Sequence, residues 1–145
     1  MAQGVKGILD AYRSTLPYIK QSGPTYFAPI LEAFTHHCQS HINKQQYNVL
    51  LIITDGVIHD MTKTKQCLAN LSTMPCSVVI IGVGEEDFEN MIELDGDGPD
   101  KLPGSARDIV QFVEFNKAAA KGDLNEQVLH EIPDQFMSFV KLHNI

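Results

Sequence analysis

The sequence predicts an α/β fold, an open doubly wound parallel sheet with helices on both faces. Two apolar runs, 49–53 and 78–81, lack the alternation of half-exposed strands and are typical of strands buried on both faces of a parallel sheet. Segments with helical spacing of apolar residues lie before, between and after these runs. The 145 residues, 43% of them hydrophobic, suffice for one domain with a sizeable core.

Two helices are expected before the first strand. Apolar residues recur at helical spacing between positions 5 and 19, and Pro17 and the Gly23-Pro24 pair end that segment. A second helix is expected over 27–42, and Thr25 lies near its start, where it could act as an N-cap.

Strands and helices then alternate. Strands are expected at 47–54, 77–82 and 109–115, and helices at 61–73 and 85–94. Asp60 is the expected N-cap of the helix over 61–73. Asp123 and Glu126 form a capping-box pattern for a last helix, and Pro133 suits a first-turn position in its second half.

The predicted sheet is narrow for its class. The run 47–54 is the most hydrophobic strand, and such strands normally have neighbours on both sides. No strand precedes the first two helices. The pattern is therefore typical of the second half of a doubly wound domain, spanning residues 1–145 and lacking its N-terminal strands. An exposed edge at 47–54 would recruit another chain, so we expect the isolated chain to form a two-fold dimer.

Composition narrows the classes of partner. Lys and Arg supply 11 charges against 18 from Asp and Glu, the formal net charge is -7, and the basic residues form no cluster. Nucleic acid is therefore not an expected partner. The apolar runs are too short to cross a bilayer, and residues 1–10 do not have the pattern of a secretory signal. Three cysteines without a C-x-x-C pair fit a reducing compartment, so we expect a cytoplasmic location.

One carboxylate stands where α/β sheets bind ligands. Ligands gather outside the carboxyl ends of parallel strands, and Thr54-Asp55-Gly56 occupies that place on the most hydrophobic strand. Asp55 could face a cation or a polar ligand there, or it could simply turn the chain. His59 follows close behind and is the histidine to test for function.

Several motifs together carry a family resemblance. They are GPTYFAP (23–29), LLIITDGVI (50–58), MPCSVVIIGVG (74–84), ELDGD (93–97), RDIVQFV (107–113) and EIPDQ (131–135). In this order, and over nearly the whole chain, they resemble the C-terminal part of the von Willebrand factor A-type domain of the copine family. Plant RING-type ubiquitin ligases carry a similar domain, but the last two motifs look closer to copines.

The resemblance implies a function. The chain is expected to be a non-enzymatic protein-interaction module of a calcium-dependent phospholipid-binding protein. The C2 domains through which copines reach membranes are not in this sequence. The whole protein is therefore expected to be cytoplasmic and peripheral at the plasma membrane.

The resemblance also implies a metal site like that of integrins, which binds Mg²⁺ or Mn²⁺ through three loops. The threonine of the second loop matches Thr25, and the aspartate of the third matches Asp55. The first loop, Asp-x-Ser-x-Ser, is absent, so we expect an incomplete site. The candidate partner face is formed by Gly56, Val57, His59 and Asp60.

Other functions remain as alternatives. A substrate-recruiting domain of a RING-type ligase would be accompanied by paired Cys/His ligands, which this sequence lacks. The segment 50–56 also resembles the nucleophile strand of haloacid-dehalogenase-type phosphatases. Their chemistry needs a second aspartate two residues on, and that position holds Val57. The loop 95–98 suggests a calcium loop, but Asp100 and Ala106 replace the required glycine and glutamate, so an acidic surface loop is expected.

Overall fold

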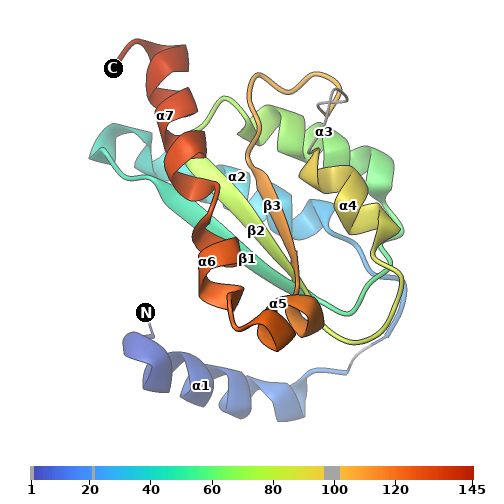
Figure 1. Cartoon of the computed structure of the whole chain (residues 1–145). Coiled ribbons are helices and arrows are strands. Elements are labelled where there is room, and N and C mark those ends of the chain that lie inside the picture. The colour runs from blue at the N-terminus through green and yellow to red at the C-terminus, as the bar shows by residue number, and fades with distance from the viewer. Residues whose placement is uncertain (1, 21, 97–101) are drawn as a thin grey trace.

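A computed structural model of the chain describes residues 2–20, 22–96 and 102–145. Within these residues, β1 (Asn48–Thr54), β2 (Cys76–Gly82) and β3 (Val110–Glu114) form one sheet in the order β1-β2-β3 (Figure 1). Both pairings are parallel, with Asn48 opposite Cys76 and Val78 opposite Val110. The predicted α/β class and parallel sheet are confirmed.

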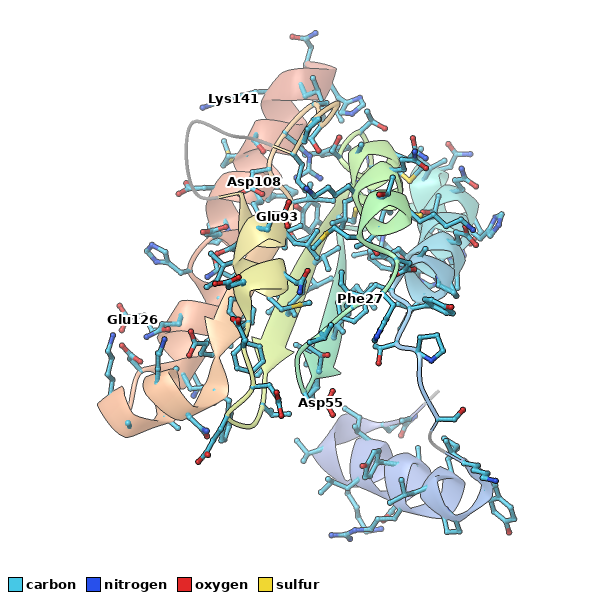
Figure 2. All side chains as sticks on the ribbon, turned by 90° about the vertical axis from the view of Figure 1, so that its right-hand side faces the viewer. Phe27, Asp55, Glu93, Asp108, Glu126 and Lys141 are labelled. Atoms are coloured by element: carbon cyan, nitrogen blue, oxygen red, sulfur yellow. The ribbon has the colours of Figure 1, made fainter. Side chains whose placement is uncertain are left out.

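Helices lie on both faces of the sheet (Figure 2). One face is covered by α2 (Ala28–His41) and α3 (Met61–Leu71). The other carries α5 (Phe115–Lys121), α6 (Leu124–Leu129) and α7 (Ile132–His143). The short helix α4 (Glu89–Asp95) lies beside β3, and its Glu93 forms an ion pair of 2.5 Å with Lys65 of α3.

The main core lies between the sheet and the α2–α3 layer. Its largest fully buried side chains come from both helices, the sheet and α4, and include Leu31, Leu68, Leu71, Val78, Ile80 and Met91. Each helix buries a single stripe here, as its apolar spacing predicts. Ile30 of α2, and Ile42 in the 3-10 turn η2 (Ile42–Lys44) that follows it, lie outside this stripe and are exposed.

The prediction that the first strand is buried on both faces is wrong. Ile52 and Thr54 are buried, whereas Val49, Leu51 and Ile53 are 48%, 51% and 65% exposed. β1 is an edge strand of the described sheet, and α5, α6 and α7 pack mainly over β2 and β3.

The first helix, α1 (Gly4–Thr15), forms where its spacing predicts and continues into the short 3-10 turn η1 (Leu16–Tyr18). No residue of α1 is buried. Its apolar stripe is fully presented to solvent, with Val5 75% and Tyr12 63% exposed. The helix stands apart from the body of the molecule, beyond the carboxyl ends of the strands (Figure 1). None of the described helices is long and apolar enough to cross a membrane.

The structure also differs from the predicted elements in smaller, local ways. α4 begins at Glu89, four residues later than expected, because the chain bends at 84–86 before it becomes helical. The short helix α5, directly after β3, was not predicted from the sequence. Pro133 lies in the first turn of α7, as predicted. Residues 97–101 of the expected acidic loop lie outside the described residues. Asp95 does not fit that expectation, since it is buried and its carboxylate accepts a hydrogen bond of 2.6 Å from the Phe112 amide.

Candidate functional site at the carboxyl end of the sheet

Asp55 leaves the sheet at the carboxyl end of β1. Thr54 is buried, and its hydroxyl accepts a hydrogen bond of 3.4 Å from the Gly56 amide. The Asp55 side chain is exposed and lies at the tip of the sheet (Figure 2). It is therefore available to a ligand rather than turned into the core.

Gly56 lets the β1–α3 loop approach the β2–α4 loop closely. Its φ of 141° lies in the region that favours glycine, and a Cβ built there would come within 3.0 Å of the Glu86 Cβ. Gly56 itself is buried. Its contribution to this end of the molecule is to position the residues on either side, Asp55 and Val57, both of which are exposed.

His59 joins this loop to the segment that carries Thr25. The His59 amide donates to the Thr25 carbonyl at 2.9 Å, and the Thr25 amide donates to His59 Nδ1 at 3.2 Å. Because His59 Nδ1 accepts a hydrogen bond, the neutral imidazole ring carries its proton on Nε2. The fold thus brings together two sequence-predicted site residues that are 34 positions apart.

Asp60 is committed to bonds inside the molecule. It occupies the N-cap position of α3, as predicted, but its carboxylate reaches the start of α2 instead. There it accepts hydrogen bonds from the amides of Phe27 at 3.0 Å and Ala28 at 2.8 Å, and one from the Thr64 hydroxyl at 3.1 Å.

The environment of Asp60 lowers its pKa. Partial burial raises the pKa, but the hydrogen bonds from Phe27, Ala28 and Thr64 favour the charged form and outweigh it. The negative charge also lies at the positive end of the α2 dipole. Asp60 therefore holds α2 against the β1–α3 loop, and so fixes the segment that precedes α2.

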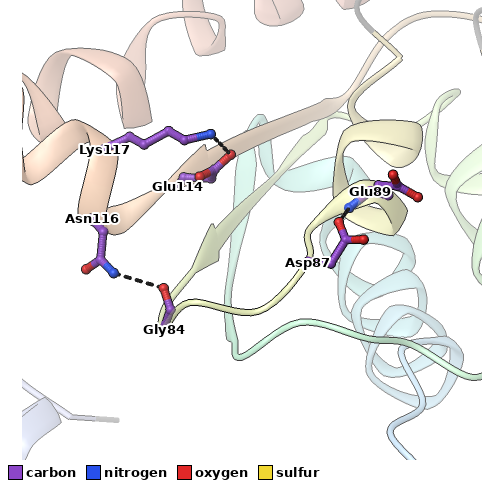
Figure 3. A network of polar contacts seen from close by, with 6 residues as sticks. All are labelled: Gly84, Asp87, Glu89, Glu114, Asn116 and Lys117. Atoms are coloured by element: carbon purple, nitrogen blue, oxygen red, sulfur yellow. Dashed lines mark hydrogen bonds and ion pairs between the residues drawn. The ribbon is translucent and has the colours of Figure 1, made fainter.

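Acidic side chains surround this end of the sheet (Figure 3). The carboxylate of Asp87 accepts a hydrogen bond of 2.9 Å from the Glu89 amide, and Glu114 forms an ion pair of 2.6 Å with Lys117. Asn116 donates to the Gly84 carbonyl at 2.9 Å, which ties the end of β3 to the loop after β2. Together with Asp55, which directly follows β1, these carboxylates favour a cation or a basic group at this end of the sheet.

The residues present do not make a complete metal shell. Thr25 and Asp55 would supply one hydroxyl and one carboxylate, both suitable for Mg²⁺. In the described parts of the chain, no group of three or more His, Cys, Asp or Glu side chains is arranged to hold an ion. Two ligand oxygens offset little of the free energy needed to dehydrate Mg²⁺, so these two residues alone would bind the ion weakly at most.

A second polar cluster, which was not predicted from the sequence, lies at the opposite end of the sheet. Arg107 is only 4% exposed. Its guanidinium donates to the Tyr47 hydroxyl and to the carbonyls of Met74, Cys76, Asp108 and Gln135. The rings of Tyr47 and Phe139 lie 6.0 and 5.5 Å from it. One side chain thus joins the starts of β1, β2 and β3 to α7. The spacing of the residues around Arg107 gives no signal of this role.

Comparison with known proteins identifies the relatives of this fold. The family model described as Copine matches residues 1–145. The chain is 47% identical over 149 aligned residues to Copine-C of Dictyostelium discoideum, across 97% of its own length. It spans 27% of that relative's length.

Proposed function

The chain belongs to the copine family, and from that premise we propose that it is a non-enzymatic protein-interaction module that docks its partner at the carboxyl end of the sheet. The whole protein is a copine-like, calcium-dependent phospholipid-binding protein. C2 domains outside these 145 residues carry its membrane contact, which makes it cytoplasmic and peripheral at the plasma membrane.

The partner face has a defined chemistry. Val57 is 49% exposed and offers an apolar contact, and His59 is exposed beside it. Gly56 and Asp60 hold this loop in place through the close approach to Glu86 and the bonds to α2. The surrounding carboxylates favour a partner that presents a basic group or a bound cation.

Thr25 and Asp55 contribute part of a Mg²⁺ or Mn²⁺ shell at this face. The exposed carboxylate of Asp55, and the loop of Thr25 held by His59, support this assignment. The remaining ligands must come from elsewhere, such as water and a carboxylate of the partner. We expect millimolar or weaker affinity for the ion in the isolated chain.

The single observation that carries the proposal is the exposed Asp55 carboxylate at the end of β1. The test is a Mg²⁺ titration of the ¹⁵N-labelled chain followed by amide chemical shifts. Shifts should concentrate at Thr25 and at 55–59, disappear in Asp55→Ala, and persist in Glu85→Ala, a matched exposed carboxylate. Shifts that are unchanged by Asp55→Ala would refute the metal assignment.

A turnover assay tests the non-enzymatic part. Wild type and Asp55→Asn are incubated with a generic phosphate ester and Mg²⁺, and we expect no difference between them. Metal-dependent hydrolysis that is lost in Asp55→Asn would instead make Asp55 a nucleophile and overturn the proposal.

A further inference from the structure

Two histidines of α2 lie directly against each other. His37 and His41 are four positions apart, so one lies a single turn above the other on the helix surface. Their ring centroids are 4.3 Å apart, and the ring planes differ by 27°. His37 is exposed and His41 is half-buried, because the stripe of α2 that faces the core includes Leu31, Phe34 and Cys38 instead. The two imidazoles are therefore within reach of a ligand from solvent.

The hydrogen bonds around His41 fix which of its ring nitrogens is free. Its Nδ1 lies 2.9 Å from the His37 carbonyl oxygen, which can only accept a hydrogen bond. The Ser40 hydroxyl lies 2.8 Å from the same nitrogen and donates its own proton to the His37 carbonyl. The Nδ1 atom therefore carries the proton, and the neutral ring has its lone pair on Nε2. Histidines that bind metal ions usually donate their other N–H to a carbonyl or carboxylate in this way.

The His37 ring has no comparable constraint. In the parts of the chain that the structure describes, it is held by ring contacts alone, to His41 and to Phe34 at a centroid distance of 6.5 Å. Because the rings of His37 and His41 are nearly parallel, their lone pairs do not converge on one point as they stand. Rotation of the exposed His37 ring about its Cβ–Cγ bond aims a nitrogen at the point that His41 Nε2 faces.

We propose that His37 and His41 together bind a divalent transition-metal ion, through one nitrogen of each ring. Imidazole nitrogens suit Zn²⁺, Cu²⁺ and Ni²⁺, whereas Mg²⁺ prefers oxygen ligands. The pair lies in the last two turns of α2, where the negative end of the helix dipole also favours a cation. This site goes beyond the proposed function, since Asp60 and the partner face lie at the other end of that helix.

The ligand count sets the expected affinity. Two imidazoles fill only part of a tetrahedral zinc shell, so the other positions are left to water or to a ligand from a partner. We therefore expect weaker binding than at zinc sites with three or four protein ligands, and tighter binding of Cu²⁺ than of Zn²⁺ or Ni²⁺.

Isothermal titration calorimetry of the whole chain with ZnCl₂ near neutral pH measures the binding. Wild type should bind one Zn²⁺, and His37→Ala and His41→Ala should each weaken the affinity by about tenfold or more, because a single imidazole is left. His36→Ala is the matched control, since His36 is exposed on the same helix but on a different side, and it should bind as wild type does. Circular dichroism checks that all three variants are folded.

Long-range ¹H–¹⁵N spectra of the imidazole rings test the assignment without any substitution. Addition of Zn²⁺ should shift the Nε2 resonance of His41 and one nitrogen of His37, while His41 Nδ1 keeps its proton. A metal chelator should reverse both shifts, and Mg²⁺ should not reproduce them.

Three results would overturn the proposal. They are a wild-type chain that binds no Zn²⁺, an affinity that is the same in His37→Ala as in wild type, and Zn²⁺-dependent shifts at other histidines in place of this pair. The Mg²⁺ titration is read at Thr25 and at 55–59, so this proposal and the proposed function fail independently.

Discussion

Asp55 and Asp60 lie on the same loop, and the structure predicts opposite consequences of replacing them. Asp60→Ala removes three acceptor contacts and leaves the amides of Phe27 and Ala28 without their partner at the start of α2. Loss of a helix cap costs about 0.5–2 kcal/mol, and leaving a partly buried donor unpaired costs about 1–3 kcal/mol. We expect Asp60→Ala to lower the free energy of unfolding by about 3 kcal/mol.

Asp60→Asn should cost less, about 1 kcal/mol, because the amide keeps one acceptor oxygen but loses the charge at the helix dipole. Asp55→Asn serves as the control. Its side chain is exposed, so its free energy of unfolding should stay within about 0.5 kcal/mol of wild type. Urea unfolding followed by circular dichroism measures all three variants.

The pH dependence supplies a second test. The folded-state pKa of Asp60 lies below its ordinary value of 3.8. The stabilisation by Asp60 is therefore fully present above the unfolded pKa and is lost as the pH falls through the folded pKa. The gap between wild type and Asp60→Asn should be constant from pH 7 to about pH 5 and shrink below about pH 4. Equal stabilities of Asp60→Ala and Asp55→Asn would refute the capping role.

Three further outcomes follow from burial. Arg107→Met should lower the free energy of unfolding by about 3 kcal/mol, because it leaves buried carbonyls without donors; a loss under 1 kcal/mol in urea unfolding would contradict this. Burial raises the pKa of Tyr47, so ultraviolet titration should show one of the four tyrosines ionising after the others, and Tyr47→Phe should remove that late step. A thiol reagent should label Cys67 first, since the other two cysteines are buried; early labelling of either would contradict the core packing.

The sequence predicted the parts of the fold that depend on local pattern. The unbroken apolar runs indicated two of the three parallel strands, and the position of Asp55 followed from the end of the first. The exposure of Leu51 did not follow, because an apolar run looks the same whether a second helical layer covers it or not. That depends on where α5, α6 and α7 pack, which periodicity does not encode.

Two residues show why roles in the site were harder to predict than positions. Asp60 was expected to cap its own helix. The fold brings the start of α2 close to it, and the amides of Phe27 and Ala28 there donate hydrogen bonds to its carboxylate. Arg107 begins the motif RDIVQFV, but the motif does not indicate what the side chain does, because that role exists only where three strand starts and α7 converge on it. Contacts of this kind are made by tertiary structure, so the residues involved leave no local trace.

The exposure of α1 has a consequence for local unfolding of the chain. A helix of 12 residues, none of them buried in the described structure, is marginal in water, so its amides should exchange with solvent orders of magnitude faster than those of β2. Any molecule that binds to the apolar stripe from Val5 to Tyr12 would have to stabilise the fully helical state of α1 as it binds. Such binding would then slow deuterium uptake at residues 4–15 and leave the uptake of the rest of the domain unchanged.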